Sequence, residues 1–580
     1  MLQFRKEISA LLAALTGMET QEIESSLEVP PAPEMGQYAF PCFLLSRRLK
    51  KPPPAIAEEL ASKIEPGEYL ERAENKGPYL NFFVRVPQLA RRLLPEVITA
   101  DENYGRLNRG EGKTVLVDFS APNIAKPFGV GHLRSTVIGN ALYRIYKALG
   151  YRVVGINHLG DWGTQFGKLI VAFRRWGEQA ELEKDPVHYL YHLYVHFHQE
   201  AEKDPSLEEE ARTQFRNLEK GDRDALELWK GFRSLSLEEF QRLYRFMGIE
   251  FDSYHGESFY NDRIEETIKL LQEKGLATES QGALVADLEP YGLPSCLLRK
   301  SDGAALYITR DLTAAIYRFE TYGFAKLFYV VGAEQTLHFK QLFKILELLG
   351  LPWAGDCFHV PFGLIYFKDG RMSTREGKVI FLEEVLTRAR ELAFEIIKEK
   401  NPSLAHKEEV ARKVGLGAVI FGDLINDRIK DVEFDWEKVL DFSGETAPYI
   451  QYSHARICSI LRRGEESSQA FLRPDGTANA VAPEELPDTG LLSSLEEQEL
   501  LITMARFQEA VIRSAEELRP SVLARYLVEL ARDFNKFYHN RPVLTAEGEL
   551  KEARLLLISS VRIMLRNGLE LLGVEAPEEM

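Results

Sequence analysis

Residues 114–157 decide the fold, and they read TVLVDFSAPNIAKPFGVGHLRSTVIGNALYRIYKALGYRVVGIN. The segments TVLVDF (114–119) and YRVVGIN (151–157) are short apolar runs of the kind that forms buried strands. Between them, HLRSTVIGNALYRIYKALG repeats its apolar residues at helical spacing and ends on Gly150, which stops a helix. A strand, a helix and a strand in this order predict a parallel sheet with a right-handed crossover.

Changes in composition divide the rest of the chain. The first part mixes helical patterns with a strand-like stretch, GPYLNFFVRV, and ends in the turn-rich segment DENYGRLNRGEGK. A helix-rich, strongly charged part follows residue 170, and short strands are expected after it at ALYI, KLFYVV and FHVPFGLIYF. The sequence predicts an N-terminal α+β domain (1–110), a Rossmann-like parallel α/β domain in two halves (111–170 and 291–381), a helical insertion between the halves (171–290) and a C-terminal helical bundle (382–580).

Composition and charge limit the classes of protein. Hydrophobic residues make up 45% and charged residues 28% of the 580 positions, enough for a sizeable core. The net charge of −16 argues against a generic basic nucleic-acid coat, although a locally basic face would still bind a polynucleotide. Four widely spaced cysteines without a CxxC pair argue against structural zinc and favour a reducing, cytoplasmic compartment. The sequence has no run of about 18 apolar residues, so it predicts no membrane span. The N-terminal MLQFRKEISALLAALTG is typical of an amphipathic helix.

The loop KPFGVGHLRST (126–136) joins the first strand to the helix. Its two glycines suggest a dinucleotide fingerprint, but the third glycine position holds Arg134, and a long loop separates the strand from Gly129. We therefore expect a phosphate site at the helix N-terminus, where backbone N–H groups and the helix dipole favour anions. Gly129 and Gly131 would let a ligand approach the backbone, and His132 would either cap the helix or donate to a phosphoryl group.

A second cationic loop, KDGRMSTREGK (368–378), follows the last expected strand of the sheet. It carries four cationic side chains, among them Arg371 and Arg375, and two hydroxyl groups. A loop of this composition is equally well explained as a solvated turn. The first loop also carries a cation, Lys126, so the expected α/β fold has two cationic loops. Two such loops on one fold predict a nucleotide-binding site.

These two loops also carry a family resemblance. DFSAPNIAKPFGVGHLRST resembles the HIGH region of class I aminoacyl-tRNA synthetases, in the form typical of the arginyl-tRNA synthetase family, and RMSTR (371–375) resembles that family's degenerate KMSKS loop. The resemblance continues through NHLGDWGTQFGKL, YITRDLTAAIYR, VGAEQTLHFKQLF, ETAPYIQYSHARICSILR and the tail LRNGLELLGVEAPEEM, so it covers essentially the whole chain. It implies a ligase that uses ATP with Mg²⁺ to form arginyl-adenylate and transfers arginine to the 2′-hydroxyl of the terminal adenosine of tRNA(Arg), releasing AMP and pyrophosphate. It also implies a cytoplasmic monomer with no membrane partner.

The resemblance implies a binding site for L-arginine. A planar guanidinium is best held by a fork of carboxylates, and Asp118 and Asp311 stand where the family pattern puts them. A plain helix N-cap is the alternative for Asp311. Tyr307 would flank the side chain and Gln335 would add a polar contact. The contacts implied for the α-amino and carboxylate end come from Ala121, Pro122 and Asn123, and the implied pocket lining includes His158, Asp161 and Gln165.

The resemblance also implies sites for ATP and for tRNA, and no metal ligand. The implied ATP contacts are Lys126, Gly131, His132, His338 and Met372, and the implied catalytic set is Lys126, Gly129, His132, Arg371, Ser373, Thr374 and Arg375. The N-terminal domain resembles the domain that contacts the tRNA elbow, and Tyr79 and Asn81 would form an exposed pair suited to an unpaired base. A core strand explains Tyr79 equally well. The C-terminal helices resemble an anticodon-binding bundle, where Arg456 is a tRNA-binding candidate although a solvated helix face also explains it.

Two places depart from the family pattern. Gly129 replaces the first histidine of HIGH, and loss of one transition-state donor costs about 10²–10³ in rate. Arg371 and Thr374 replace the two lysines of KMSKS, and we hypothesise that Lys126, upstream of HIGH as in family members of this type, supplies the lost charge. Three functions stay open: an active arginyl-tRNA synthetase, a tRNA-binding or regulatory paralogue with a weakened catalytic site, and a class I synthetase for another amino acid.

Overall fold

A four-stranded parallel sheet forms the centre of the molecule. The computed structural model describes residues 1–580 except 125, 127, 302, 304–305, 368–379 and 466–486. In the sheet, β4 (Thr114–Asp118), β5 (Arg152–Ile156), β9 (Lys326–Tyr329) and β10 (Cys357–His359) lie in the order β10-β9-β4-β5, and every pair is parallel. The helix α6 (Leu133–Ala148) makes the crossover from β4 to β5. The parallel α/β fold predicted from residues 114–157 is therefore confirmed.

The two faces of the sheet have different cores, because side chains alternate along a strand. On β4, Val115 and Val117 belong to the core that includes α6 and the C-terminal helices. Leu116 points to the opposite face and belongs to the core built by α13 (Tyr307–Tyr322) and α14 (Thr336–Leu348).

The prediction of a strand at ALYI is wrong, because α13 begins there at Tyr307. A short apolar run does not distinguish a strand from a buried helix. Here Ile308, Leu312 and Ala315 are buried at helical spacing against the sheet.

The insertion between the halves of the sheet is mainly helical. Its last part also contains a small antiparallel sheet in the order β6-β7-β8, which the sequence did not indicate. Its elements are α7 (Thr164–Trp176), α8 (Gln179–Lys184), α9 (Pro186–Lys203), α10 (Ser206–Glu219), α11 (Arg223–Phe246), the 3₁₀ helix η4 (Glu257–Arg263), α12 (Ile264–Glu273), β6 (Thr278–Ser280), β7 (Ala283–Ala286) and β8 (Cys296–Arg299).

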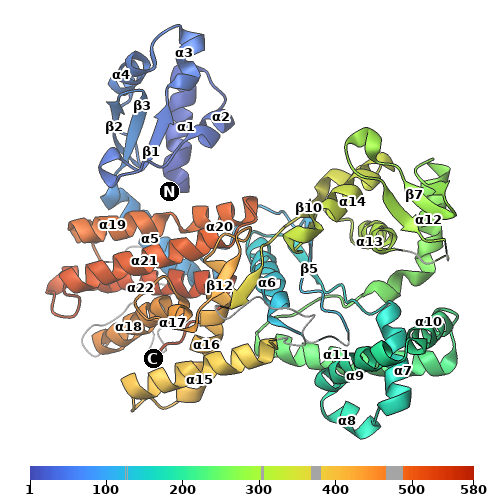
Figure 1. Cartoon of the computed structure of the whole chain (residues 1–580). Coiled ribbons are helices and arrows are strands. Elements are labelled where there is room, and N and C mark those ends of the chain that lie inside the picture. Colours follow the sequence, from blue (N-terminus) through green and yellow to red (C-terminus); the bar gives the residue numbers. More distant parts are fainter. Residues whose placement is uncertain (125, 127, 302, 304–305, 368–379, 466–486) are drawn as a thin grey trace.

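The N-terminal part is an α+β unit that stands above the bundle in Figure 1. Its antiparallel sheet has the order β1-β3-β2. Its elements are α1 (Leu2–Thr16), α2 (Thr20–Ser26), β1 (Tyr38–Pro41), α3 (Phe43–Leu49), α4 (Pro53–Lys63), β2 (Leu70–Lys76) and β3 (Tyr79–Val84). The next helix, α5 (Val86–Ala100), lies among the helices of the bundle, against α19 (Leu495–Ala505) and α22 (Gly548–Leu571).

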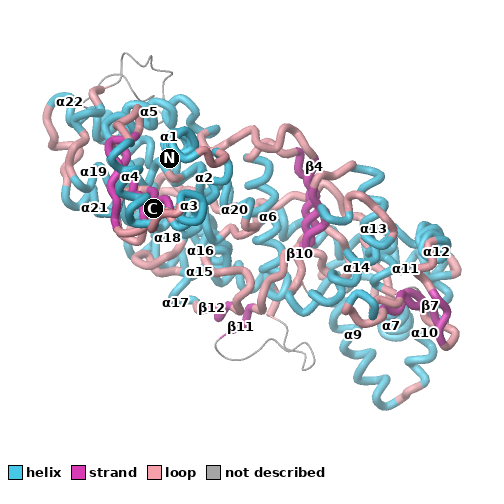
Figure 2. Tube along the Cα trace, turned by 90° about the horizontal axis from the view of Figure 1, so that it is seen from above, coloured by secondary structure: helices cyan, strands magenta, loops and turns pink. Residues whose placement is uncertain are grey.

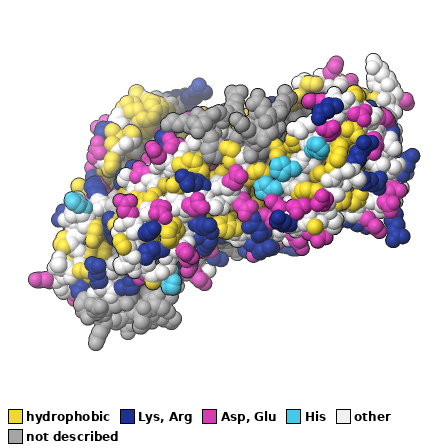
Figure 3. Space-filling model, turned by 60° about the horizontal axis from the view of Figure 1, so that its bottom comes forward, with side chains coloured by type: hydrophobic (Ala, Val, Ile, Leu, Met, Phe, Trp, Pro, Cys, Tyr) yellow, Lys and Arg dark blue, Asp and Glu magenta, His cyan; other side chains and the backbone are white. Residues whose placement is uncertain are grey.

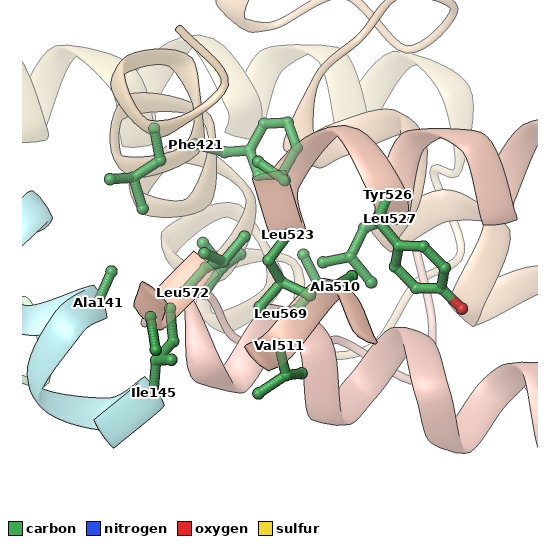
Figure 4. Packing of buried hydrophobic residues seen from close by; sticks show 14 of the residues in the cluster. Ala141, Ile145, Phe421, Ala510, Val511, Leu523, Tyr526, Leu527, Leu569 and Leu572 are labelled. Atoms are coloured by element: carbon green, nitrogen blue, oxygen red, sulfur yellow. The ribbon is translucent and has the colours of Figure 1, made fainter. Parts of the chain in front are cut away.

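Within the residues that the structure describes, the C-terminal part is helical apart from one short strand, β12 (Val432–Phe434), which pairs in parallel with β11 (Ile365–Phe367). The crossover helix α6 packs directly on the bundle (Figure 4). Its residues Ala141 and Ile145 lie in the same buried cluster as Leu523, Leu527 and Leu569 of the bundle. The elements are α15 (Leu382–Lys400), α16 (Lys407–Leu424), β12 (Val432–Phe434), α17 (Trp436–Val439), α18 (Ala447–Glu465), α19 (Leu495–Ala505), α20 (Phe507–Glu516), α21 (Ser521–Asn540) and α22 (Gly548–Leu571).

Seen from above, the molecule is elongated, with the bundle at one end, the parallel sheet in the middle and the insertion at the other end (Figure 2). Among the helices that the structure describes, none is both long and apolar enough to cross a membrane.

Candidate active site

A cavity of about 1170 Å³ lies at the carboxyl ends of the parallel strands, the edge where open α/β sheets bind ligands. Its walls come from the loop after β4, the start of α6, the start of α13, the segment after β9, and β11. The predicted residues that line it are Asp118, Ala121, Asn123, Lys126, Gly131, His132, His158, Gln165, Tyr307, Asp311, Gln335 and His338. The predicted residues Arg371, Met372, Ser373, Thr374 and Arg375 lie outside the described part of the chain.

At one end of the cavity, the N-terminus of α6 opens toward the interior. His132 occupies the N-cap position but its side chain makes no capping hydrogen bond, so the capping interpretation is wrong. Its Nδ1 atom is buried and has no hydrogen-bond partner among the described residues. Burial lowers the pKa of His132 to about 4, and the charge of Lys126 acts in the same direction, so the imidazole is neutral at pH 7. A Cβ atom at Gly131 would meet no atom within 4 Å, which leaves open space in front of the helix.

Gly129 has an ordinary extended backbone, with φ −84° and ψ 168°. It forms an antiparallel bridge with Phe381, and the flanking amides of Val130 and Leu382 donate to Ile380 O (3.2 Å) and Phe128 O (2.9 Å). The backbone conformation therefore does not require glycine. The pairing joins the loop of residues 126–132 to Ile380 and Phe381, just after the second cationic loop.

Two consecutive residues of the loop after β4 have left-handed backbones: Ser120 with φ 70° and Ala121 with φ 46°. For residues other than glycine, such conformations cost about 1–3 kcal/mol each and persist only where the surroundings impose them. Ser120 N donates to Ser135 Oγ at 2.9 Å, and its hydroxyl lies 2.7 Å from the hydroxyl of Tyr244 on α11. The insertion thus helps to hold Ala121 and Asn123 against the cavity, a role that nothing in the sequence indicated for Tyr244.

Asp311 lies at the other end of the cavity, between two histidines. Its carboxylate is 2.6 Å from Nε2 of His338 and 3.9 Å from Nε2 of His158. It is the fifth residue of α13, whose N-cap is Leu306, so the N-cap interpretation of Asp311 is wrong. Asp311 faces the cavity from the same end as the exposed ring of Tyr307.

The predicted fork of Asp118 and Asp311 needs a correction. Asp118 Oδ2 lies 2.9 Å from Nη2 of Arg318, and both side chains are buried. Arg318 follows Asp311 by two helical turns on α13, so the chain's own guanidinium already holds the Asp118 carboxylate. The sequence does not reveal this pairing because the two residues are 200 positions apart.

A carboxyl group that the sequence analysis missed completes this end of the cavity. Glu257, the first residue of η4, lines the cavity together with Asp311. Burial raises the pKa of Glu257 to about 8; nearby Arg310 lowers it, and the carboxylates of Asp311 and Asp161 raise it. Glu257 and Asp311 therefore form a pair of neighbouring acidic groups that a cationic ligand can reach, and Glu334 and Asp431 also line the cavity. Glu257 sits in the charged insertion, where its sequence neighbourhood gives no signal of burial.

Asp161 is not a lining residue, which corrects the predicted pocket contact. Its side chain is fully buried and accepts hydrogen bonds from Arg233 Nε (2.7 Å) and from the amide (2.8 Å) and hydroxyl (2.9 Å) of Ser258. It fixes the turn that carries Glu257. Two further predicted residues, Pro122 and Gly129, are buried beside the cavity and do not line it.

The tRNA candidates of the N-terminal part lie together on β3. Tyr79 is half-buried and packs edge-to-face on Phe43, with ring centroids 5.7 Å apart. The expectation that Asn81 is exposed is wrong: it is 4% exposed, and its Oδ1 has no hydrogen-bond partner among the described residues.

On the bundle, Arg456 lies between two half-exposed aromatic rings. Its guanidinium lies 4.7 Å from the ring centre of Tyr452 and 5.3 Å from that of Tyr538, and it donates to Asn535 Oδ1 at 2.6 Å. A second cavity, of about 440 Å³, lies beside Tyr452 and is lined also by Phe442, Asn401 and Met580. On the face of the molecule seen in Figure 3, Lys and Arg side chains lie interspersed with Asp and Glu and form no single basic field.

Comparisons with known proteins cover the whole chain. Three family models match: "tRNA synthetases class I (R), catalytic domain" over residues 93–436, "Arginyl tRNA synthetase N terminal domain" over residues 2–84, and "DALR anticodon binding domain" over residues 450–580. The arginine–tRNA ligases of Clostridium beijerinckii and Halothermothrix orenii are 50% identical over 580 residues and 48% identical over 581 residues, with both chains covered in full.

Solved structures agree. The arginyl-tRNA synthetase of Thermus thermophilus superposes with a TM-score of 0.82 at 28% identity, covering 99% of this chain and 100% of that one. The arginyl-tRNA synthetase of Plasmodium falciparum, at 24% identity, has the same fold with a TM-score of 0.81 and 99% coverage of each chain.

The parallel sheet is split by an insertion, the loop of residues 126–132 leads from it into the N-terminus of α6, and a helical bundle that matches an anticodon-binding model follows. These features define a class I aminoacyl-tRNA synthetase. The specificity for arginine follows from two findings: the full-length relatives are arginine–tRNA ligases, and the matching catalytic-domain model is the class I (R) model. The chain belongs to the arginyl-tRNA synthetase family and is an aminoacyl-tRNA ligase.

Proposed function

We propose that this chain joins L-arginine to tRNA(Arg) in two steps driven by ATP. One observation carries the assignment: a single cavity has two carboxyl groups at the end beside α13 and a helix N-terminus with a neutral histidine at the end beside α6, and these two helices cover opposite faces of the sheet. The first end suits a guanidinium and the second suits a phosphate. A catalytically weakened paralogue, the alternative left by the sequence, would have no reason to keep both ends.

For arginine, Glu257 and Asp311 hold the guanidinium, and the ring of Tyr307 flanks it. His338 and His158 keep the Asp311 carboxylate oriented from either side. Asn123 and the strained backbone at Ala121 receive the α-amino and α-carboxylate groups, with Gln335 adding a polar contact across the cavity.

For ATP, the phosphates lie at the N-terminus of α6 in front of Gly131. An α-carboxylate oxygen of arginine attacks the α-phosphorus, the bond from that phosphorus to the bridging oxygen breaks, and pyrophosphate leaves with the electron pair. His132, neutral at pH 7, donates an N–H to the charge that develops, and Lys126 adds a fixed positive charge beside it. This assigns Lys126 the charge that the KMSKS-like loop lacks.

In the second step, the 2′-hydroxyl of the terminal adenosine attacks the arginyl carbonyl, and AMP leaves. The described residues contain no group of three or more His, Cys, Asp or Glu side chains able to hold a metal ion. We therefore treat Mg²⁺ as the ion that accompanies the ATP phosphates, and no step here passes through it.

For tRNA, we propose that residues 1–110 contact the elbow and residues 382–580 bind the anticodon side. The unpartnered Oδ1 of Asn81 supports base recognition next to Tyr79, since a buried acceptor without a donor is costly. The Tyr452–Arg456–Tyr538 cluster beside the second cavity supports stacking of an unpaired base.

We further propose a cytoplasmic monomer. All four cysteines are free and buried, which suits a reducing compartment. Light scattering on the purified chain measures the oligomeric state directly.

Arginine-dependent exchange of pyrophosphate into ATP, measured with and without tRNA(Arg), tests the function. We expect exchange with arginine and not with lysine or citrulline, and esterified tRNA at completion. Exchange with another amino acid would identify a different class I synthetase. No exchange and no arginylation in the presence of tRNA would support the paralogue, whereas a negative result without tRNA alone decides nothing, because members of this family often need tRNA for activation.

A further inference from the structure

The loop formed by residues 425–431 lies where three parts of the molecule meet, and we call it the junction loop. It follows α16 and precedes β12. Its side chains and carbonyls contact the bundle, the cavity wall and the start of α6, although these three parts are far apart in sequence.

On the bundle side, the contact is the turn between α20 and α21. Arg428 Nε donates to Leu518 O at 2.9 Å, and Arg519 Nη2 lies 2.6 Å from Asp427 Oδ2. Leu518 has a left-handed backbone with φ 51°, so this turn is held in one particular shape. It belongs to the part of the chain that matches the anticodon-binding model, residues 450–580.

On the cavity side, the same arginine reaches the wall. Arg428 Nη1 donates to Pro361 O at 2.7 Å, and Leu364 N donates to Asp431 Oδ1 at 2.7 Å. Phe362, Gly363 and Leu364 line the main cavity and lead into β11. A shift of the junction loop would therefore move the wall that faces ATP.

The third contact is with α6, through Arg134 in its first turn. Its Nη1 donates to Gly363 O and to Lys430 O, both at 2.8 Å, and its Nε lies 2.7 Å from Asp423 Oδ1 at the end of α16. The side chains of Arg134 and Asp423 are each 1% exposed. The helix whose N-terminus faces the phosphates is thus fixed to the same loop as the wall opposite.

We propose that the junction loop couples tRNA binding at the bundle to the geometry of the ATP site, and that Arg428 is the positioning residue. The inference rests on the proposed function. A guanidinium is planar and rigid, so its donors to Leu518 O and Pro361 O keep a fixed separation, and movement of one carbonyl is transmitted to the other. A flexible lysine with a single charged centre transmits less.

The junction also contains a small polar cavity of about 10 Å³, the volume of one water molecule. Three polar atoms of the residues that line it have no hydrogen-bond partner among the described residues: Asp423 Oδ2, Arg519 Nε and Ser521 Oγ. Such groups can change partners when the bundle moves.

Steady-state arginylation by the full-length chain tests this coupling, with kcat, KM for tRNA and KM for ATP measured separately. We expect Arg428→Ala to lower kcat at saturating tRNA by about 10-fold and to raise KM for ATP, because hydrogen bonds from a charged donor are lost on both sides. KM for tRNA should change little, and the variant should stay folded at the assay temperature. Arg428→Lys should recover part of kcat. The matched control is Arg412→Ala: Arg412 joins α16 to the segment after α22, through Glu575 at 2.7 Å, without touching the wall, and the kcat of this variant should equal that of the wild type.

An unchanged kcat for Arg428→Ala, or a change confined to KM for tRNA, overturns the coupling. If Arg428→Ala does not fold, Asp427→Asn replaces it, since it weakens the bundle-side contact with Arg519 and keeps the donors of Arg428 to Leu518 O and Pro361 O, and it should lower kcat in the same way. An unchanged kcat for Asp427→Asn then overturns the coupling. Absence of arginylation by the wild type overturns the proposed function itself, so the two failures are distinguishable.

Discussion

Glu257 should make the affinity for arginine depend on pH. Its pKa of about 8 means that the carboxyl group is protonated in the free enzyme at neutral pH. A guanidinium binds the carboxylate, so arginine displaces the proton, and the apparent dissociation constant scales with 1 + 10^(pKa−pH). Between pH 6 and pH 8 this factor falls from about 101 to about 2, so binding should tighten by about 50-fold as the pH rises.

Isothermal titration calorimetry with L-arginine measures this effect. In two buffers with different ionisation enthalpies, the heats at pH 7 should show release of about 0.9 proton per arginine bound. Glu257→Gln mimics the protonated group, so it should match the wild type near pH 6 and bind arginine about 10- to 50-fold more weakly at pH 8, since a charge-assisted hydrogen bond is lost. A wild-type affinity that is flat between pH 6 and pH 8 would refute the reasoning. A slope that persists in Glu257→Gln would mean that the displaced proton does not come from Glu257.

Three further predictions concern ATP and tRNA. Lys126→Ala should lower arginine-dependent pyrophosphate exchange by about 10-fold or more, since it removes a fixed charge at the developing phosphate charge; a rate within a few-fold of the wild type would exclude Lys126 as the substitute for the missing KMSKS lysine. Gly129→His should raise adenylate formation or leave it unchanged, because the backbone at this position is ordinary; a clear loss in single-turnover assays would mean that the loop has been rebuilt around glycine. Tyr452→Ala should raise KM for tRNA by about 10-fold with little change in kcat, from the loss of base stacking; an effect on kcat alone would contradict that role.

The sequence predicted the fold well where the pattern is local. The strands and the crossover helix of residues 114–157 follow from side-chain periodicity, and the structure has them at the predicted places. The stretch ALYI failed because burial makes helix and strand look alike over so few residues. The small sheet β6-β7-β8 was missed because its strands are short and partly exposed.

The site was predictable only as far as its residues carry motifs. His132 and Asp311 line the cavity as the motifs indicate. Asp118 also lines it, but its carboxylate is paired with Arg318, a partner fixed by tertiary packing. Glu257 illustrates the opposite failure. Its pKa depends on burial by distant segments, and in the sequence it is one acidic residue among many in the insertion.

The left-handed residues Ser120 and Ala121 have a consequence for how the chain folds. An unfolded chain seldom visits this conformation at residues other than glycine, so local preference works against forming the loop. The contacts that impose it come from Ser135 and from Tyr244, and the latter is 124 residues downstream of Ser120. Because contacts distant in sequence form late, the substrate loop should be ordered only after the insertion has docked on the sheet. During synthesis, the first half of the nucleotide fold then emerges with this loop still unordered, and the loop can be held in place only once Tyr244 of α11 has been made.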